Sequence, residues 1–289
     1  MRTLCAGHVN WDVTLHVERL PEPDGETPIE RRVQAGGGSA ANVAAGLSGL
    51  SVDAALLGSV GTDASGRLAV GELRTAGVDC SNVREAEGET AVKYLVVDRE
   101  GEVMVLASEG ENEAFSADDL APGALERVDH LHLTSQRPGT AATLAERAAT
   151  AGVTVSFDPG RRIEERDYAE AIARTDLLLV NEREAAALER TGFSIESLVE
   201  EGRVVVTKRG AAGARIDSPD GVFEHPGYGV DVVDTTGAGD AFASGFIAAG
   251  GEGYERALSV ANACGALAVG VHGARADLSW EAVDALAGG

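Results

Sequence analysis

The sequence of 289 residues is poor in lysine and in cysteine. Its only lysines are Lys93 and Lys208. The three cysteines, Cys5, Cys80 and Cys264, lie far apart and show no C-x-x-C spacing. An odd number of dispersed cysteines predicts neither a disulfide framework nor a zinc site. Acidic residues outnumber basic ones 47 to 24, which argues against nucleic acid as a partner, because phosphate backbones require clustered bases.

Long apolar runs and the common nucleotide-binding motifs are absent as well. No run reaches the roughly 18 apolar residues of a membrane span, and no leader-like segment opens the chain, so we expect a cytoplasmic protein without a membrane partner. No G-x-x-x-x-G-K-[ST] loop occurs, and no G-x-G-x-x-G opens a βαβ unit. The net charge of −23 accompanies 44% hydrophobic residues, which favours a folded chain over disorder. Such an acidic, lysine-poor surface is typical of halophilic proteins, and an acidic face for a basic partner is the alternative.

The hydrophobic pattern predicts an α/β protein. From about residue 120, short apolar strands alternate with helices, as in a parallel sheet covered on both faces. Strands at 9–17 and 27–33 and a hairpin at 91–106 do not follow this alternation, so we expect them to form a small separate sheet. The other expected elements are helices at 39–50, 140–150, 168–174 and 183–191, strands at 54–60, 130–133, 153–157, 177–180, 204–207 and 230–233, and two C-terminal helices.

Residues 234–246 read DTTGAGDAFASGF and bear most directly on function. Gly237 and Gly239 stand between an extended segment and an apolar-periodic stretch, which indicates a tight turn and a helix N-terminus. Free N–H groups and the helix dipole favour an anion there. Asp240 would repel a bound phosphate unless it accepted a proton from the attacking hydroxyl. The dipole alone also favours an acid in the first turn, so the turn by itself leaves both interpretations open.

This run is similar to the signature D-T-x-G-A-G-D of the ribokinase (PfkB) family of carbohydrate kinases. Near the N-terminus, residues 36–44 (GGGSAANVA) and 57–66 (LGSVGTDASG) resemble the first signature of the same family. Glycines let the backbone lie against a polyol, and Asn42 offers a donor and acceptors to hydroxyls. The two signatures occur in the family's order, and together with shorter motifs the resemblance spans the chain from Cys5 to about Ala276.

Shorter motifs between the signatures extend the resemblance. The run GHVNWD resembles the family's first strand, whose acid, here Asp12, bonds sugar hydroxyls. The run DPGRR is similar to D-x-N-x-R, with Gly160 in place of the usual Asn. NERE matches N-x-x-E, and Asn181 could equally cap the following helix. TKRGAAG resembles the nucleotide loop T-x-G-x-x-G, with one additional residue before Gly210. Residues 262 and 265–273 correspond in position to the segments that contact the adenine ring in this family.

The resemblance implies a ribokinase-like three-layer sandwich with a mainly parallel sheet and a small β-sheet lid. It implies a single kinase domain over 1–289, with lid strands from about 9–34 and 90–107. It also implies the following site. The catalytic residues are Asp240 as base and Gly237, Ala238 and Gly239 as anion hole; the substrate residues are Asn10, Asp12, Gly37, Gly38, Asn42 and Arg162; the nucleotide residues are Asn181, Glu184, Thr207, Gly210, Gly213, Asn262 and Gly265.

The implied reaction moves the terminal phosphoryl group of a nucleotide to a hydroxyl of a small polyol: the γ-phosphoryl group of ATP, or the β-phosphoryl group if ADP is the donor. Mg²⁺ would be placed by Asn181 and Glu184, mostly through water. Potassium would lie near Asp234, Thr236 and Gly273, with backbone carbonyls near Ala268 and Val271. The lid would close over the substrates and exclude water, and its exposed edges suggest a homodimer.

The acceptor stays open at this stage. A plain sugar is the first expectation and a nucleoside the second. A sugar phosphate such as ribose 1-phosphate is the third, because Arg137, Arg161, Arg162 or Lys93 could pair with its phosphate. A non-catalytic sugar- or nucleotide-binding regulator is the alternative from another class, and the intact Asp240 argues against it.

Overall fold

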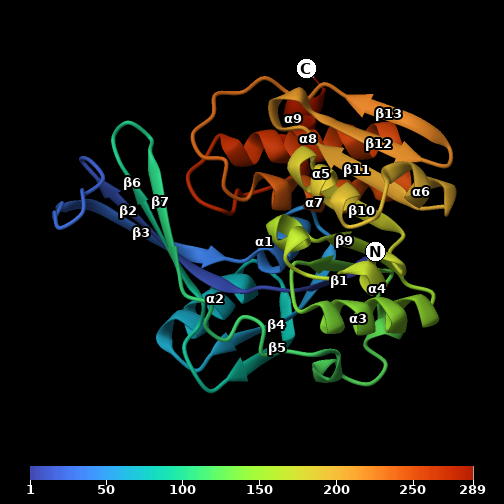
Figure 1. Ribbon diagram of the computed structural model, residues 1–289, viewed down its shortest axis with the longest axis horizontal. Coiled ribbons are helices and arrows are strands. Elements are labelled where there is room, and N and C mark those ends of the chain that lie inside the picture. Colours follow the sequence, from blue (N-terminus) through green and yellow to red (C-terminus); the bar gives the residue numbers. More distant parts are fainter. Residues whose placement is uncertain (289) are drawn as a thin grey trace.

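The computed structural model describes residues 1–288 and contains two β-sheets, the larger of which is covered by helices (Figure 1). No helix within this range combines the length and the apolar composition needed to cross a membrane. The strands are β1 Arg2–Ala6, β2 Asn10–Val17, β3 Ile29–Gly37, β4 Asp53–Gly61, β5 Asp79–Ala86, β6 Val92–Val97, β7 Val103–Ala107, β8 His130–Thr134, β9 Thr154–Asp158, β10 Leu177–Asn181, β11 Val204–Lys208, β12 Ala214–Ser218 and β13 Gly221–His225. The helices are α1 Ser39–Gly49, α2 Ala64–Thr75, α3 Pro138–Thr150, α4 Ala169–Ile172, α5 Glu182–Arg190, α6 Ile195–Glu200, α7 Ala238–Ala249, α8 Tyr254–Val269 and α9 Trp280–Ala287.

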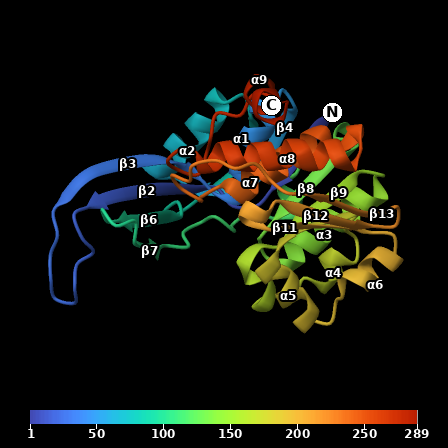
Figure 2. The ribbon, with the colours of Figure 1, turned by 90° about the horizontal axis from the view of Figure 1, so that it is seen from above.

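The large sheet has the strand order β13-β12-β11-β10-β9-β8-β1-β4-β5. Neighbouring strands from β11 to β5 are parallel, and the pairs β11–β12 and β12–β13 are antiparallel. Helices α1, α2, α7, α8 and α9 lie on one face, and α3, α4, α5 and α6 lie on the other (Figure 2). The three-layer α/β architecture expected from the sequence is therefore confirmed.

Both faces of the sheet are apolar, which explains the nearly continuous hydrophobic runs of its strands. Successive side chains of a strand point to opposite faces. In β10, Leu179 packs in the core beneath α1 and α7, whereas Leu178 and Val180 pack in the core beneath α3 and α5. The alternation of strand and helix along the sequence thus reflects two separate hydrophobic cores.

The small sheet has the order β3-β2-β6-β7 and projects from the large one as an arm (Figures 1 and 2). Strand β2 pairs with β3 antiparallel and with β6 parallel, and the hairpin β6–β7 completes the sheet. The separate sheet expected for the early strands is confirmed. Strand β3 extends to Gly37, so part of the glycine run belongs to this sheet.

The expectation of a strand at 230–233 is wrong. Residues 226–236 form no strand, and the N–H groups of Val233 and Asp234 instead donate to the carbonyl of Val269 at the end of α8. The sheet continues through the hairpin β12–β13, which the sequence reading missed. The edge position is filled by this hairpin, so the valines at 230, 232 and 233 lie exposed in a connecting loop.

Candidate active site

A cavity of about 840 Å³ lies where the carboxyl ends of the parallel strands meet the small sheet. Ligands of open α/β sheets bind in this crevice, where the strand order reverses, and here β1 lies between β8 and β4. The predicted site residues that line the cavity are Asn10, Asp12, Gly38, Asn42, Arg162, Asn181, Glu184, Thr236, Gly237, Gly239 and Asp240.

The turn before α7 has the geometry that an anion-binding helix N-terminus requires. Gly237 is the residue before the first turn and has a left-handed backbone with φ 77°. A Cβ there would lie 2.0 Å from the carbonyl oxygen of Ala274, so only glycine fits. The first N–H groups of α7, from Ala238 onward, lack intrahelical partners and add to the positive end of the helix dipole. This end of α7 can therefore bind a phosphate.

Asp240 lies in the first turn of α7 and faces charged groups from several strands. Asn42 Nδ2 of α1 donates to its Oδ2 at 2.8 Å. Burial raises the pKa of Asp240 to about 6; the hydrogen bond from Asn42 opposes this, Asp158 adds to it, and Lys208 and Lys93 oppose it. A carboxylate with a pKa near 6 is suited to accept a proton from an alcohol near neutral pH.

Lys208 and Asp158 form an ion pair that the sequence reading did not assign. Lys208 Nζ lies 2.6 Å from Asp158 Oδ2, and both side chains are largely buried in the cavity wall. Burial lowers the pKa of Lys208, but the nearby Asp158 and Glu184 outweigh it, and the net pKa is raised. Two features of the sequence could have indicated this pair. Both residues are the last residues of parallel strands, and lysine occurs only twice in the chain.

Asn181 and Glu184 form a capping box at the start of α5. Asn181 Oδ1 accepts from the N–H of Glu184, and Glu184 Oε2 accepts from the N–H of Asn181, both at 2.9 Å. Burial and Asp158 raise the pKa of Glu184, against Lys208 and Asn181. In residues 1–288 no three His, Cys, Asp or Glu side chains are arranged to hold a metal ion. The two residues fit a Mg²⁺ that takes most of its ligands from water and nucleotide phosphates.

The residues predicted for potassium are brought together by Asp234. Its two oxygens accept from the N–H groups of Thr236 at 2.9 Å and Gly273 at 3.0 Å. Burial opposes these hydrogen bonds, which nevertheless hold the pKa of Asp234 below its ordinary value. Asp234 is thus an ionised carboxylate beside two loops, a donor set that fits a monovalent cation. A role for potassium stays a prediction.

Asp12 of β2 lies at the lid end of the cavity. Burial raises its pKa, against Lys93 and Arg275. Its Oδ1 is shielded from solvent and has no hydrogen-bond partner among residues 1–288. A Cβ on Gly37 would lie 2.2 Å from Asp12 Oδ2, so glycine makes room for the carboxylate. The contact of Asp12 with a sugar hydroxyl stays a prediction.

Segment 108–114 crosses from the small sheet to the strand ends and carries polar contacts that the sequence did not predict. Asn112 Nδ2 donates to Asn10 Oδ1 at 3.0 Å, and Glu113 lies 2.7 Å from both His8 and Arg166. Burial opposes the effect of these two partners, which lower the pKa of Glu113 to about 2. Glu113 is therefore a fixed anion that orders this wall of the cavity.

Three arginines stand on the same wall. Arg137 follows β8, and Arg161 and Arg162 follow β9. Arg137 lies 3.9 Å from Glu113, whose carboxylate already binds His8 and Arg166. Arg162 lies 2.8 Å from Glu109, which is 80% exposed. The counter-charges of Arg137 and Arg162 are shared or solvated, and Arg161 forms no ion pair within residues 1–288, so these guanidinium groups can bind a ligand anion.

Apart from Asn181 and Glu184, the residues predicted to bind the nucleotide do not line this cavity. Thr207 lines a second, more open cavity bounded by α5, α6 and β12. Asn262 donates to Leu258 within α8, and a Cβ on Gly265 would lie 3.5 Å from Ala238 of α7. Gly210 and Gly213 form the turn after β11, where a Cβ on Gly213 would lie 1.9 Å from the carbonyl oxygen of His225. Their nucleotide roles stay predictions.

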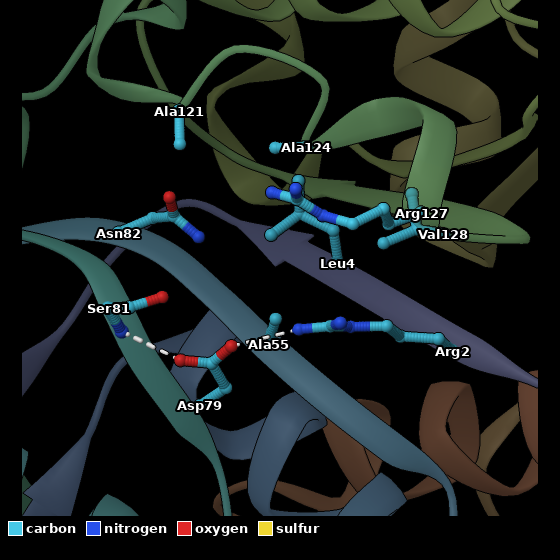
Figure 3. A pocket seen from close by; sticks show the side chains of 10 residues that line it. All are labelled: Arg2, Leu4, Ala55, Asp79, Ser81, Asn82, Ala121, Ala124, Arg127 and Val128. Carbon is cyan, nitrogen blue, oxygen red and sulfur yellow. Dashed lines mark hydrogen bonds and ion pairs between the residues drawn. The ribbon is translucent and has the colours of Figure 1, made fainter.

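A small pocket of about 70 Å³ lies at the other end of the parallel strands and contains no predicted site residue (Figure 3). Arg2 donates to Asp79 at 2.9 Å, and Asp79 accepts from the N–H of Ser81 at 3.0 Å. Arg2 also lies 3.6 Å from Asp53, and its Nε has no hydrogen-bond partner among residues 1–288. Most of the predicted site residues lie instead around the large cavity at the carboxyl ends of the strands.

Comparison with known proteins agrees with this geometry. A model of the pfkB family of carbohydrate kinases matches residues 2–281. An ATP-dependent ribose-1-phosphate kinase of Halopiger xanaduensis is 55% identical over 289 residues, which cover 99% of this chain and 97% of that protein. The crystal structure of a nucleoside kinase of Methanocaldococcus jannaschii has a TM-score of 0.88 at 27% identity and covers 99% of this chain and 98% of its own.

A ribokinase structure from Thermotoga maritima also has a TM-score of 0.88, at 24% identity, and covers 100% of this chain and 99% of its own. That likeness concerns the fold alone. The family match extends over nearly the whole chain and includes both glycine signatures. The chain therefore belongs to the PfkB family of carbohydrate kinases and is a phosphotransferase.

Proposed function

We propose that the protein is an ATP-dependent kinase of ribose 1-phosphate. The observation that carries this proposal is the arginine wall of the cavity, formed by Arg137, Arg161 and Arg162 beside the Asp12 and Asp240 carboxylates. A sugar that already bears a phosphate needs such cations, whereas a plain sugar does not. The 55% identity to a ribose-1-phosphate kinase supports the same acceptor. This reverses the order expected from the sequence, in which a plain sugar came first.

Asp240 acts as the general base in this proposal. It takes the proton of the attacking hydroxyl, while the N–H groups of Gly237, Ala238 and Gly239 stabilise the charge on the transferring phosphoryl group. Lys208 lies beside this end of the cavity, where a Cβ on Gly239 would be 3.5 Å from Nζ. The positive charge of Lys208 compensates the negative charges of Asp158 and Glu184 near the anion-binding turn.

Mg²⁺, held near Asn181 and Glu184 when nucleotide is bound, would neutralise charge on the phosphate oxygens. We also propose that Asp234, Thr236 and Gly273 hold a potassium ion behind the anion-binding turn. The small sheet would act as a lid, and its edge strand β7, whose valines and Leu106 are more than half exposed, would pair with a second copy. With a net charge of −23, the protein would work best in concentrated salt, as cytoplasmic halophilic proteins do.

The 5-hydroxyl is the acceptor that this arrangement favours. In ribose 1-phosphate, the phosphate on C1 and the primary hydroxyl on C5 project from opposite sides of the ring. The arginines come from the ends of β8 and β9, whereas Asp240 comes from α7 and bonds to α1. A phosphate bound by the arginines would therefore direct the 5-hydroxyl toward Asp240.

A nucleoside is the second candidate acceptor, favoured by the fold and 27% identity shared with a nucleoside kinase. A nucleoside carries a neutral base at C1 and would leave the arginines without an anion. The two acceptors are therefore distinguished by their dependence on the arginine wall. Membership of a kinase family and the intact anion-binding turn disfavour a non-catalytic regulator.

The test measures phosphoryl transfer to ribose 1-phosphate, ribose, ribose 5-phosphate and nucleosides, with ATP or ADP as donor, in Mg²⁺ and molar KCl. We expect the highest kcat/KM with ATP and ribose 1-phosphate, and phosphorus NMR should identify a 1,5-bisphosphate. Arg162→Gln and Arg137→Gln should raise KM for ribose 1-phosphate and leave any activity on ribose unchanged. Arg174→Gln, on the surface, is the matched control. A preference of the unaltered protein for nucleosides would refute the proposal.

A further inference from the structure

Arg275 is a largely buried arginine that belongs to neither glycine signature. It follows α8, and only 16% of its side chain is exposed. Its Nε donates to Asn42 Oδ1 of α1 at 2.9 Å, and a terminal nitrogen donates to the carbonyl of Gly37 in β3 at 3.4 Å. The other terminal nitrogen lies 3.6 Å from Glu72 of α2. The guanidinium group thus joins β3, α1 and α2, which all lie far from Arg275 in the sequence.

The contact with Arg275 determines how the amide of Asn42 is oriented. A guanidinium group only donates hydrogen bonds, so it must face the amide oxygen. The amide nitrogen of Asn42 then faces Asp240 and donates to its Oδ2 at 2.8 Å. The opposite orientation would place two acceptors against each other at Asp240. Arg275 therefore determines which atom Asn42 presents to the carboxylate.

The same guanidinium group contacts the end of lid strand β3. This strand runs from the projecting small sheet toward the large sheet and its helices (Figure 2). The N–H of Gly36 donates to Glu72 Oε2 at 2.7 Å. A Cβ on Gly36 would lie 2.5 Å from a terminal nitrogen of Arg275 and 2.8 Å from Glu72 Oε2. Glycine at this position is what allows the strand to lie against the ion pair.

We infer that Arg275 is a positioning residue for phosphoryl transfer, which acts through Asn42 to hold the Asp240 carboxylate in place while lid strand β3 lies against it. The inference rests on the proposed role of Asp240 as general base. In this inference Asn42 has two roles: it orients the Asp240 carboxylate, and it contacts the polyol as the sequence predicts. Arg275 also links the lid to the chemistry, because Gly37 and Asn42 bind the same guanidinium group.

Charged groups from several neighbouring elements face Asp240, whereas α1 contributes the uncharged Asn42. The charged groups are Asp158 of β9, Lys208 of β11, Lys93 of β6 and Arg275 after α8, and Asp12 of β2 lies close to Lys93 and Arg275. Removal of Arg275 withdraws a positive charge and the anchor of the Asn42 hydrogen bond. Both changes favour protonated Asp240. The acidic limb of the kcat profile should consequently move to higher pH.

The experiment compares Arg275→Ala and Arg275→Lys with the unaltered protein. We expect Arg275→Ala to lower kcat about 10- to 100-fold, as small misplacements of catalytic groups do, with KM for the acceptor changed much less. Millimolar guanidinium ion should restore kcat several-fold in Arg275→Ala, whereas Na⁺ at the same ionic strength should not. Arg275→Lys cannot donate to Asn42, Gly37 and Glu72 in the same fork and should recover only part of the rate.

Three further variants separate the possible explanations. Arg256→Ala, which removes a partly exposed arginine bonded to Asp284 on α9, is the control and should keep the original kcat and pH profile. Gly36→Ala displaces the guanidinium group without removing it and should reproduce the loss in kcat. In Asn42→Ala, a further Arg275→Ala change should have no additional effect on kcat at pH values above the acidic limb, because Asn42 no longer connects Arg275 to Asp240.

Two outcomes would overturn the inference. If Arg275→Ala keeps the original kcat and acidic limb, or if its loss is equally large in the Asn42→Ala background, Arg275 does not act through Asn42. Thermal unfolding of each variant identifies any loss of fold, and Gly36→Ala then provides the measurement with the arginine retained. Asp240→Asn tests the proposed function separately: if it keeps its activity, the base assignment fails, whatever Arg275 does.

Discussion

Replacement of the proposed base should lower activity and raise stability at the same time. Asp240→Asn removes the proton acceptor but keeps an oxygen that can accept the hydrogen bond from Asn42, now 2.8 Å long. General-base catalysis contributes on the order of 10²–10⁴-fold, so kcat should fall by that factor while both KM values change little. In the unaltered protein, kcat should decline below about pH 6 and reach roughly a tenth of its plateau near pH 5.

The gain in stability follows from the raised pKa of Asp240, which is about 6 against an ordinary value of 3.8. Because the folded-state pKa exceeds the unfolded one, the ionised carboxylate destabilises the fold as the pH rises through 6. One pKa unit corresponds to about 1.36 kcal/mol, so about two units give nearly 3 kcal/mol. Because the carboxylate faces a hydrated cavity, we expect Asp240→Asn to stabilise the protein by about 1–3 kcal/mol at neutral pH.

Urea unfolding in molar KCl, followed by the fluorescence of Trp11 and Trp280, measures this gain. It should be present at pH 7.5 and absent near pH 4, where Asp240 is protonated in the folded state of the unaltered protein. Asp231→Asn, in an exposed loop, is the control and should change neither quantity. A variant with nearly normal kcat, or one less stable than the unaltered protein at pH 7.5, would refute the reasoning.

Three further predictions concern the charge and the turns of the site. Lys208→Met should lower the free energy of unfolding by about 3 kcal/mol, because it leaves the buried Asp158 unpaired. Asp158→Asn in the same background should recover part of this loss, and an unchanged urea midpoint in Lys208→Met would contradict the prediction. Gly237→Ala should destabilise the fold by about 1–3 kcal/mol and abolish phosphoryl transfer, since its Cβ would meet Ala274. Gly71→Ala on α2 is the control: no atom lies within 4 Å of the new Cβ, so thermal unfolding should show a neutral or stabilising effect. Potassium should activate the kinase more than sodium at matched ionic strength, and equal rates in the two salts would remove Asp234 from a cation site.

Much of the fold follows from local pattern. The apolar runs near 54–60, 130–133 and 177–180 become β4, β8 and β10, because a strand buried on both faces must be apolar throughout. The valines at 230–233 have the same local pattern but form a loop, since β12 and β13 occupy that edge of the sheet. Periodicity reports what a segment can form, and competition for sheet positions decides what it does form.

In the candidate site, too, local sequence patterns predict some features and only the tertiary structure reveals the others. Asp240, Gly237 and Gly239 were identified from one run of residues, because a glycine turn before a helix is a local structure with a local signature. Lys208, Glu113 and Arg275 were not assigned, because each acquires its meaning from partners more than 30 residues away: Asp158 for Lys208, His8 and Arg166 for Glu113, and Asn42 for Arg275.

By itself, the sequence determined the α/β architecture, the family and the anion-binding turn, since these depend on hydrophobic periodicity and on glycines at fixed local spacings. Only the tertiary structure decided which charges compensate one another around Asp240 and how Asn42 is oriented. Coulomb and hydrogen-bond energies depend on separation in space and on burial, and neither quantity is encoded by distance along the chain.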